Sequence, residues 1–319
     1  MYKFLARVLT LFIKDKKVRD KKYKQLVYGT QDPKHIKLIM VLLCKDEIDI
    51  IENWIKFHKS VGVDGFIVTD NGSCDGTREV LNKYKESGDI LEIIDEPSSD
   101  YQQAKWCDRM IKLAKEKYKA DWIISSDADE FWYPNSLNLK KDIILNSGIN
   151  VQSVYLKDYI PIENLDNYFM GTYWINRKLN KFEQEKYHIN CSNYFIKNMV
   201  PKVIFKARDY ISIDMGNHNV KVKNRRFANI SNIKIYHYFI RNFKHFNNKV
   251  KKGGESILNN PDKSVGTHWR NWYENYYLND KMEKAWGEHF DFEHFDKLYN
   301  IGVITKDSSI KDFIEYINR

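Results

Sequence analysis

The sequence predicts an α/β fold in which a mostly parallel sheet is flanked by helices and followed by a helical C-terminal extension. Two observations lead to this prediction. Continuous apolar runs such as Leu38–Leu43 are typical of strands that are covered on both faces. Amphipathic helices separate these runs, and a regular alternation of strands and helices predicts a parallel sheet whose ligands bind outside the carboxyl ends of the strands.

Local patterns indicate the first two strands and their helices. Leu38–Leu43 is the first strand, and the helix expected over 48–58 has apolar residues three and four positions apart. Gly65–Thr69 is the second strand. A run of turn-forming residues follows it and predicts a helix capped by Asp75 or Thr77.

The third and fourth strands are expected at Ile90–Ile94 and Trp122–Ser126. Between them, a helix over 101–118 places on one side Trp106, Met110, Leu113 and Lys117. Up to this point the chain alternates strictly between strands and helices.

Two carboxylates, Asp127 and Asp129, follow directly after the fourth strand. Residues two apart in an extended segment point the same way, so this pair is able to share a hard divalent cation and the phosphates it carries. The alternative is a strand that ends in an acidic turn, since Asp-x-Asp is a short motif. Its position after a buried strand favours the metal site.

Acidic residues also follow other strands. Glu47 comes after the first strand and Asp70 after the second, as Asp127 and Asp129 do after the fourth. Separate surface turns would explain each residue singly. Because the carboxyl ends of parallel strands share one edge of a sheet, an active-site cleft explains them together.

These residues carry a resemblance to a known family. The chain resembles the family 2 glycosyltransferases, in the branch close to family 92, over roughly residues 36–255. The matching residues are Lys45-Asp46-Glu47, Trp54, His58, Thr69 to Thr77, Asp127-Ala128-Asp129-Glu130-Phe131, Pro201-Lys202-Val203-Ile204, Gly216-Asn217-His218, Ile235-Tyr236-His237-Tyr238, Arg241, Phe246, Lys249 and Gly253.

The resemblance implies a GT-A fold that holds a nucleotide-sugar donor, with a UDP-sugar as the expected donor, and Mn²⁺ or Mg²⁺ bridging its phosphates. Glu47 and Asp70 would hold the base and ribose, Asp127 would face ribose and metal, and Asp129 would bind the metal. The donor site implied by the resemblance also contains Lys45, Asn71 and Gln103. A bound cation stabilises the charge that develops on a departing diphosphate.

One residue departs from the family pattern. Asp46 stands where the family more often has asparagine, which adds a negative charge beside the expected nucleotide. Lys45 is the nearest residue in the sequence that would offset it.

Two of the nine histidines have a context that suggests chemistry. His237 ends an apolar strand and precedes a basic helix, which resembles the position of a third metal ligand; a buried, hydrogen-bonded histidine is the alternative. His218 lies in a turn and is the second choice, for a ligand or for acceptor contact. Surface or packing roles are expected for His35, His58, His188, His245, His268, His289 and His294.

The family's usual mechanism is inverting, with one in-line displacement and a general base that takes the proton of the acceptor hydroxyl. The candidates for this base are Asp158, Glu163 and His218, and no motif decides between them.

Composition fits an enzyme. The 319 residues are 43% hydrophobic and 14% aromatic, enough for one large core, and they contain no internal repeat. The expected division is a basic amphipathic segment over 1–35, the catalytic domain over 36–242 and an aromatic-rich helical extension over 243–319. The four cysteines are widely spaced, so they suggest neither zinc nor a disulfide framework, and a reducing cytosol fits them.

The basic regions leave alternatives open. The apolar run near the N-terminus is too short and too interrupted to span a bilayer, but with the lysines after it the segment fits a helix on an anionic leaflet or a helix packed on the domain. The basic residues over 243–252 fit phosphate or membrane binding, or a solvated helix face. The aromatic residues over 267–277 either stack on sugar rings or belong to the core.

The residues and the resemblance together predict a metal-dependent glycosyltransferase of the hexosyltransferase class. The resemblance implies that it is inverting and that it acts on a glycan or lipid-linked acceptor in bacterial surface polysaccharide or lipopolysaccharide synthesis. Its expected location is the cytoplasm or the inner membrane face. A phosphatase that uses the Asp-x-Asp pair and a nucleic-acid or membrane-binding protein are the alternatives. Four acidic strand ends argue against a nucleic-acid partner, and the absence of a glycine-rich turn after the first strand argues against a nicotinamide enzyme.

Overall fold

The computed structural model describes residues 10–11, 13–16, 18–19, 32–98, 102–145, 148–197, 200–258, 267–290 and 292–319. Most of the basic segment expected over 1–35 lies outside these residues. The chain forms two compact units: unit 1 comprises Met1–Leu156 and Val200–Ile235, and unit 2 comprises Lys157–Met199 and Tyr236–Arg319. The chain passes from unit 1 to unit 2 twice, each time inside a strand: β7 (Leu156–Asp158) and β13 (Ile233–His237).

Unit 1 is built on a seven-stranded sheet of order β12-β6-β9-β4-β1-β2-β3. Strands β1, β2, β3 and β4 run parallel to their neighbours in this group, and β12 is parallel to β6. Strand β9 is antiparallel to both β4 and β6. The predicted α/β class with a mostly parallel sheet is confirmed. The strands are β1 (Leu38–Cys44), β2 (Gly65–Asp70), β3 (Ile90–Asp95), β4 (Trp122–Ser126), β6 (Val151–Val154), β9 (Lys202–Lys206) and β12 (Phe227–Asn229).

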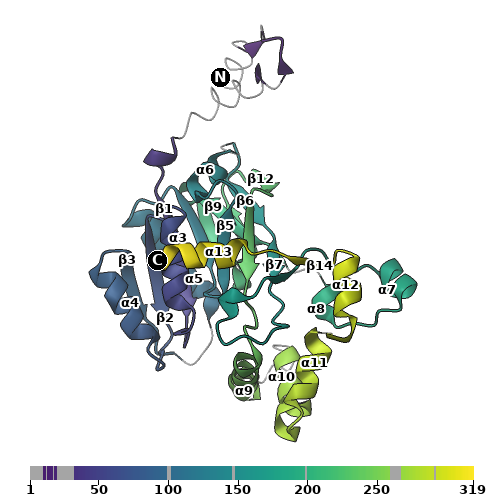
Figure 1. Cartoon of the computed structure of the whole chain (residues 1–319). Helices are drawn as coiled ribbons and strands as arrows, with labels where there is room; N and C mark the ends of the chain where they lie inside the picture. Colours follow the sequence, from purple (N-terminus) through teal and green to yellow (C-terminus); the bar gives the residue numbers. More distant parts are fainter. Residues whose placement is uncertain are drawn as a thin grey trace. The chain divides into compact units, whose positions relative to one another are not determined.

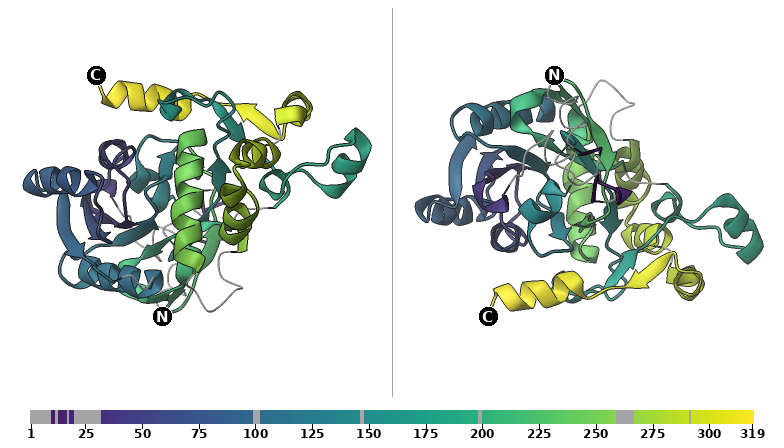
Figure 2. Two further views of the ribbon diagram at one scale, coloured as in Figure 1. Left: turned by 90° about the horizontal axis from the view of Figure 1, so that it is seen from below. Right: turned by 90° about the horizontal axis from the view of Figure 1, so that it is seen from above.

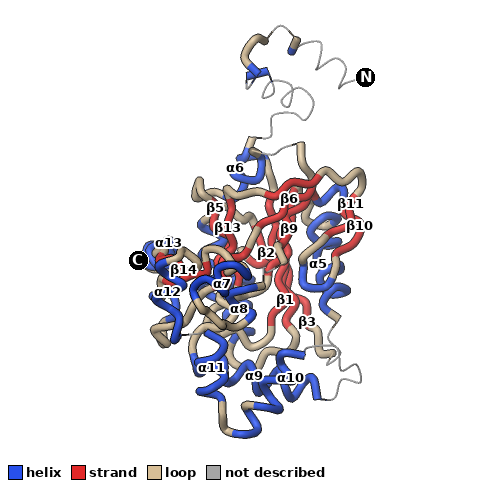
Figure 3. The backbone as a smooth tube through the Cα atoms, turned by 90° about the vertical axis from the view of Figure 1, so that its right-hand side faces the viewer, coloured by secondary structure: helices blue, strands red, loops and turns tan. Residues whose placement is uncertain are grey.

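Helices flank this sheet (Figures 1 and 3), and α5 packs against it through several buried residues. Its buried residues include Cys107, Met110 and Ile111, which join one hydrophobic cluster with sheet residues such as Ile39 and Ile123. The helices of unit 1 are α3 (Ile51–Ser60), α4 (Thr77–Glu86), α5 (Gln103–Glu116) and α6 (Leu139–Ile144), with short 3₁₀ turns η1 (Pro33–His35), η3 (Ala207–Asp209) and η4 (Met215–Asn217). Three further strands are β5 (Glu130–Pro134), β10 (Tyr210–Ile213) and β11 (Val220–Val222).

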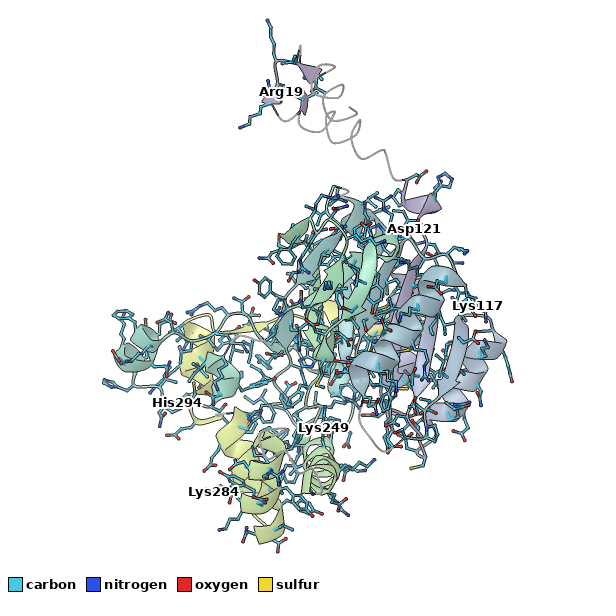
Figure 4. The ribbon with its side chains drawn as sticks, turned by 180° about the vertical axis from the view of Figure 1, so that it is seen from behind. Arg19, Lys117, Asp121, Lys249, Lys284 and His294 are labelled. Atoms are coloured by element: carbon cyan, nitrogen blue, oxygen red, sulfur yellow. The ribbon has the colours of Figure 1, made fainter. Side chains whose placement is uncertain are left out.

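Some predicted details differ from the structure. Helix α3 begins at Ile51 and α5 ends at Glu116, so Lys117 lies beyond the helix. Lys117 is exposed on the outside of unit 1 and its ammonium lies 2.9 Å from Glu92, because a lysine gains more from water and a carboxylate than from an apolar face (Figure 4). The N-cap of α4 is Gly76, and Asp75 contributes by accepting the backbone N–H of Thr77 at 3.0 Å.

Unit 2 has its own cores. One cluster joins residues of the first segment, such as Ile160 and Phe195, with Leu298 and Ile304 of the second. The domain division expected from the sequence grouped 157–199 with the catalytic domain, whereas these residues pack with the C-terminal ones. The elements are η2 (Tyr168–Met170), β8 (Tyr173–Ile175), α7 (Lys181–Tyr187), α8 (Asn193–Ile196), α9 (Phe243–Leu258), α10 (Thr267–Asn275), η5 (Tyr277–Asn279), α11 (Met282–Phe290), η6 (Phe292–His294), α12 (Phe295–Asn300), β14 (Ile304–Lys306) and α13 (Ser309–Ile317).

The predicted helical C-terminal extension is confirmed, and Figure 2 shows its helices from α9 in green to α13 in yellow. Its aromatic residues form a core: Phe246, Tyr273, Trp286 and Phe290 are buried in one cluster, against which Trp269 and Trp272 pack. Lys249 of the basic helix also turns inward, with its Nζ atom 4.6 Å from the centre of the Phe239 ring. No helix among the described residues is long and apolar enough to cross a membrane.

Candidate active site

The register of the parallel strands brings the predicted acidic loops to one edge of the sheet. Cys44 of β1 lies opposite Asp70 of β2, Leu42 of β1 opposite Ser126 of β4, and Asp70 opposite Asp95 of β3. The segments that follow these strands, 45–47, 71–77 and 127–129, therefore leave the sheet at the same edge, which we call the carboxyl edge.

The loop after β1 is tied to the loop after β2. The backbone N–H of Asp46 donates to Ser73 Oγ at 3.0 Å, and that of Glu47 donates to Thr77 Oγ1 at 2.8 Å. Asp46 has a φ of 55°, and its Oδ1 accepts the N–H of Cys74 at 2.9 Å. Aspartate and asparagine both tolerate this left-handed conformation and both carry the acceptor oxygen, which explains how Asp46 replaces the usual asparagine.

Asp70 is buried, with 4% of its surface exposed, although it lies at the end of its strand. Its Oδ1 accepts the backbone N–H of Ser73 at 3.0 Å and the Ser73 hydroxyl at 2.6 Å, and Arg78 Nη1 lies 3.3 Å from its Oδ2. Arg78 also pairs with Asp95. Asp70 therefore shapes the loop in which Asn71 donates its side-chain amide to the carbonyl oxygens of Glu96 and Ser98. Lys45, by contrast, is exposed at the carboxyl edge.

Asp127 belongs to a network of charges after β4. Lys202, at the start of β9, places its Nζ 2.6 Å from Asp127 Oδ2 and 2.8 Å from Glu130 Oε1. Burial by itself would lower the pKa of Lys202, but the carboxylates of Glu130 and Asp127 outweigh it and raise that pKa. The side chain of Asp127 is 34% exposed, and that of Glu130 only 1%. Asp127 is thus the member of the network that a ligand is able to reach.

The turn at η4 joins this network from the other side. Asn217, with a φ of 60°, accepts the Ser125 hydroxyl on its Oδ1 at 2.9 Å and directs its Nδ2 toward Asp127 Oδ1 at 3.4 Å. Gln103 at the start of α5 accepts the backbone N–H of Gly216 at 2.9 Å. The predicted donor-site residue Gln103 therefore fixes the turn that carries Asn217 and His218.

His218 follows this turn and is half-buried. Its Nδ1 lies 3.2 Å from the carbonyl oxygen of Pro201, which is able only to accept, so Nδ1 carries the proton and Nε2 the lone pair. Burial and the positive charge of Lys202 lower the pKa of His218. These influences favour the neutral imidazole, in which Nε2 is the atom able to accept a proton, as a general base must.

Asp129 is buried, with 8% of its surface exposed, two residues beyond Asp127. Among the described residues, no three His, Cys, Asp or Glu side chains are grouped closely enough to hold a metal ion by themselves. A cation that is bound through one or two carboxylates usually obtains its other ligands from substrate phosphates and water. The accessible Asp127 and the adjacent Asp129 fit that kind of site.

The remaining predicted residues belong to unit 2. His237 donates from Nδ1 to Asp158 Oδ1 at 2.9 Å, and Lys178 donates to Asp158 Oδ2 at 2.9 Å. Burial tends to raise the pKa of Asp158, but these two partners outweigh it and lower that pKa. Asp158 is only 1% exposed, whereas Glu163 is exposed on a loop. The roles assigned to His237, Asp158 and Glu163 stay predictions.

Sequence reasoning missed several residues of the network. Lys202 and Asn217 both lie in segments that carry the family resemblance, but no role was assigned to either. Ser125 and Arg78 had no sequence signal of their own. Lys202, Asn217 and Arg78 each contact a carboxylate in the folded chain. Ser125 acts one step further away, because its hydroxyl donates to Asn217 across 92 positions.

The mostly parallel sheet with one antiparallel strand, the acidic loops at its carboxyl edge and the helical extension match the architecture expected of a GT-A type glycosyltransferase. The model of glycosyltransferase family 92 matches residues 45–286, about three quarters of the chain, and the chain belongs to this family. This confirms the resemblance read from the motifs.

Solved structures give weaker likenesses. Staphylococcus aureus TarS 1-349 is 15% identical to this chain, over 82% of this chain and 74% of TarS 1-349, with a TM-score of 0.39. A second structure of TarS 1-349, in complex with UDP-GlcNAc, is 14% identical over 82% of this chain and 75% of that one, also with a TM-score of 0.39. Mycobacterium tuberculosis glucosyl-3-phosphoglycerate synthase, in complex with Mn²⁺, UDP and glucosyl-3-phosphoglycerate, is 20% identical over 39% of this chain and 45% of that one, with a TM-score of 0.29. At these levels the likenesses say nothing about the ligands of this chain. Comparison with curated protein sequences gave no match.

Proposed function

We propose that this family 92 enzyme is a metal-dependent, inverting glycosyltransferase whose donor binds at the carboxyl edge of unit 1. The observation that carries the proposal is the position of Asp127. Its carboxylate is one-third exposed at the end of a buried parallel strand, two residues before Asp129. Ligands of open α/β sheets bind outside such strand ends.

The loops after β1 and β2 would hold the nucleotide. Because Asp46, Ser73, Cys74 and Thr77 are joined by hydrogen bonds, the two loops form one fixed surface. Glu47, Asp70 and Asn71 are the proposed contacts to base and ribose, with Lys45 at the exposed rim. We propose a UDP-sugar as the donor; this choice of base rests on analogy with the wider superfamily.

Asp127 and Asp129 would hold Mn²⁺ or Mg²⁺ together with the donor diphosphate. When it is bound, the cation supplies Lewis-acid stabilisation of the leaving diphosphate. The protein holds the two carboxylates at a strand end, where one of them is already buried and the other is fixed by Lys202 and Asn217. His237 belongs to unit 2 and stays a metal ligand predicted from the sequence alone.

His218 is the general base that the geometry of unit 1 favours. Its Nδ1–H is held by the Pro201 carbonyl, and its turn is shared with Asn217, which reaches Asp127. In the proposed step the acceptor oxygen forms a bond to the anomeric carbon while the bond from that carbon to the diphosphate breaks, and Nε2 takes the hydroxyl proton. Asp158 is less suited because both of its oxygens accept hydrogen bonds.

The acceptor is proposed to be a glycan or a lipid-linked precursor of a bacterial surface polysaccharide or lipopolysaccharide, modified in the cytoplasm or at the inner membrane face. The net charge of +9 fits an acidic acceptor or an anionic surface. The pathway itself rests on analogy.

Thermal unfolding of the purified protein with UDP-, GDP-, CMP- and dTDP-sugars, each with and without Mn²⁺, tests the proposal. A ligand that binds only the native state raises the melting temperature. We expect a shift with one nucleotide class that requires Mn²⁺. An equal shift of the melting temperature without Mn²⁺ would contradict metal dependence. If no sugar nucleotide shifts the melting temperature, the proposed donor site at the carboxyl edge is wrong.

A further inference from the structure

Lys202 is a buried, positively charged residue at the carboxyl edge. The proposed function gives it no role in binding the donor or in removing the acceptor proton. Its side chain is 4% exposed, and its ammonium touches two carboxylates, those of Asp127 and Glu130. We call these three residues the carboxylate–lysine cluster. One end of the cluster, at Glu130, is fully buried, and the other end, at Asp127, reaches solvent.

The charges of the cluster do not cancel. Two carboxylates and one ammonium leave a net charge of −1, and Lys202 divides its attraction between them at 2.6 and 2.8 Å. Glu130 is also held by neutral donors, since Asp127 N–H and Ser126 Oγ–H point to its Oε2 at 3.3 and 3.4 Å. Lys202 thus lies beside the buried Glu130, while the exposed Asp127 is able to take a second cation from solvent.

A divalent cation that approaches Asp127 meets the ammonium of Lys202 on the same carboxylate. Like charges a few ångströms apart repel, and beside the buried ammonium of Lys202 this repulsion is less screened than in bulk water. A diphosphate that arrives with the cation brings negative charge and removes this obstacle. Because of Lys202, the site should bind a free cation more weakly than a cation that arrives with a nucleotide diphosphate.

We infer that Lys202 is a charge-balancing residue that makes cation binding at Asp127 and Asp129 conditional on the donor diphosphate. This inference rests on the proposed function, because it assumes that these two carboxylates bind the cation. Lys202 is a positioning residue in this scheme and touches neither donor nor acceptor.

Binding of Mn²⁺, followed by the electron paramagnetic resonance signal of the free ion, tests the inference without any turnover. Wild type is titrated with Mn²⁺ alone and then with Mn²⁺ and UDP, GDP or CDP. We expect weak binding of Mn²⁺ alone and binding about tenfold tighter with one of the diphosphates. Equal affinity with and without every nucleotide would overturn the inference.

Four variants separate charge balance from packing. K202M should bind Mn²⁺ alone about tenfold more tightly than wild type, because the cluster then carries −2. K202R keeps the charge and should resemble wild type. K202M/E130Q restores a net charge of −1 and should return the affinity toward wild type, which a purely structural role of Lys202 does not predict.

The fourth variant, E130Q, keeps Lys202 and should bind Mn²⁺ alone more weakly than wild type, so it tests the inference even where K202M does not fold. Thermal unfolding of each variant reports whether it is folded. Mn²⁺ affinities that are the same in wild type, K202M and E130Q would overturn the inference and leave the proposed function standing. No Mn²⁺ binding by wild type, with or without nucleotide, would overturn the proposed metal dependence and this inference together.

Discussion

His58 and Trp132 are joined across the core of unit 1, where Nε2 of His58 accepts the backbone N–H of Trp132 at 3.1 Å. The other ring nitrogen donates to the carbonyl oxygen of Trp54 at 2.9 Å, and the side chain is fully buried. The imidazole therefore links α3 to β5 as a neutral group with both nitrogens occupied. Burial lowers its pKa to about 3.

Because of this buried neutral histidine, the stability of unit 1 should depend on pH in the acidic range. The unfolded chain binds a proton to His58 near pH 6.5 and the folded chain does not, so stability falls as the pH drops below 6.5 toward 3, by about 1.4 kcal/mol per pH unit. H58Q keeps a donor and an acceptor but does not titrate. The loss of unfolding free energy between pH 6.5 and 5 should be smaller in H58Q by about 2 kcal/mol, measured by urea unfolding. Parallel profiles would contradict the prediction.

Loss of the Asp129 carboxylate should abolish transfer and leave the fold intact. D129N is expected to reduce kcat/KM by about 10²-fold or more, because it weakens the cation and its contact with the diphosphate. The melting temperature should change little. D166N, in an exposed loop of unit 2, is the matched control. Unchanged turnover in D129N would contradict the proposed metal-binding role of Asp129.

His218 as the base predicts both a rate and a pH profile. H218Q should lower kcat by about 10²- to 10⁴-fold with a smaller effect on KM, because general base catalysis acts in the transition state. Since the pKa of His218 is lowered, the wild-type rate should fall only on the acidic side of the ordinary histidine range, and H218Q should lose this limb. A profile that keeps the limb, or an equal loss in E163Q, would transfer the role to another residue.

Asp307 ties the start of α13 to the rest of unit 2. Its oxygens accept the Tyr236 hydroxyl at 2.6 Å and the Ser309 hydroxyl and N–H at 2.6 and 3.0 Å, and Lys157 pairs with it. Burial would raise its pKa, but Lys157, Ser309 and Tyr236 outweigh it and lower that pKa. The stabilisation is present above the unfolded pKa near 3.9 and disappears as the pH falls further. D307N should cost about 2 kcal/mol at pH 7, and the difference from wild type should shrink below pH 4 in acid unfolding.

Two glycines in helices should respond in opposite directions. A Cβ on Gly254 of α9 would lie 2.2 Å from ring atoms of Tyr273 in α10, whereas a Cβ on Gly287 of α11 would meet nothing within 4 Å. G254A should therefore destabilise by about 1–3 kcal/mol through overpacking. G287A should stabilise by up to about 1 kcal/mol through helix propensity. Thermal unfolding compares the two, and equal effects would show that the close approach of Tyr273 does not matter.

The first half of the fold was predictable because its strands are mostly apolar. β1, β2 and β4 are buried along nearly their whole length, and each ends in a polar turn. β5 was not predicted, because it begins with a charged residue, Glu130, that interrupts the apolar pattern of a buried strand. In the folded chain Glu130 is buried because Lys202 neutralises its charge. β9 begins and ends with lysines that are both buried, which a local hydropathy pattern does not anticipate.

The candidate site was predictable as a set of strand ends but not as a set of contacts. Asp127 and Asp129 follow a strand that the sequence identifies, so their place at the edge could be derived. The partners of Asp127 come from Lys202 and Asn217, 75 and 90 positions away, and those of Asp158 from His237, 79 positions away. Only the crossing connections of the folded sheet bring these together.

The place of β9 between β4 and β6 imposes an order on folding during synthesis. When a ribosome has released β4 and β6, both strands still lack the partner that joins them, because β9 emerges about fifty residues later and the first segment of unit 2 is made in between. Until then the edge of β4 is unpaired, and unpaired edges invite wrong pairing with other nascent chains. The synthesis of β9 therefore ends the period in which β4 exposes an unpaired edge.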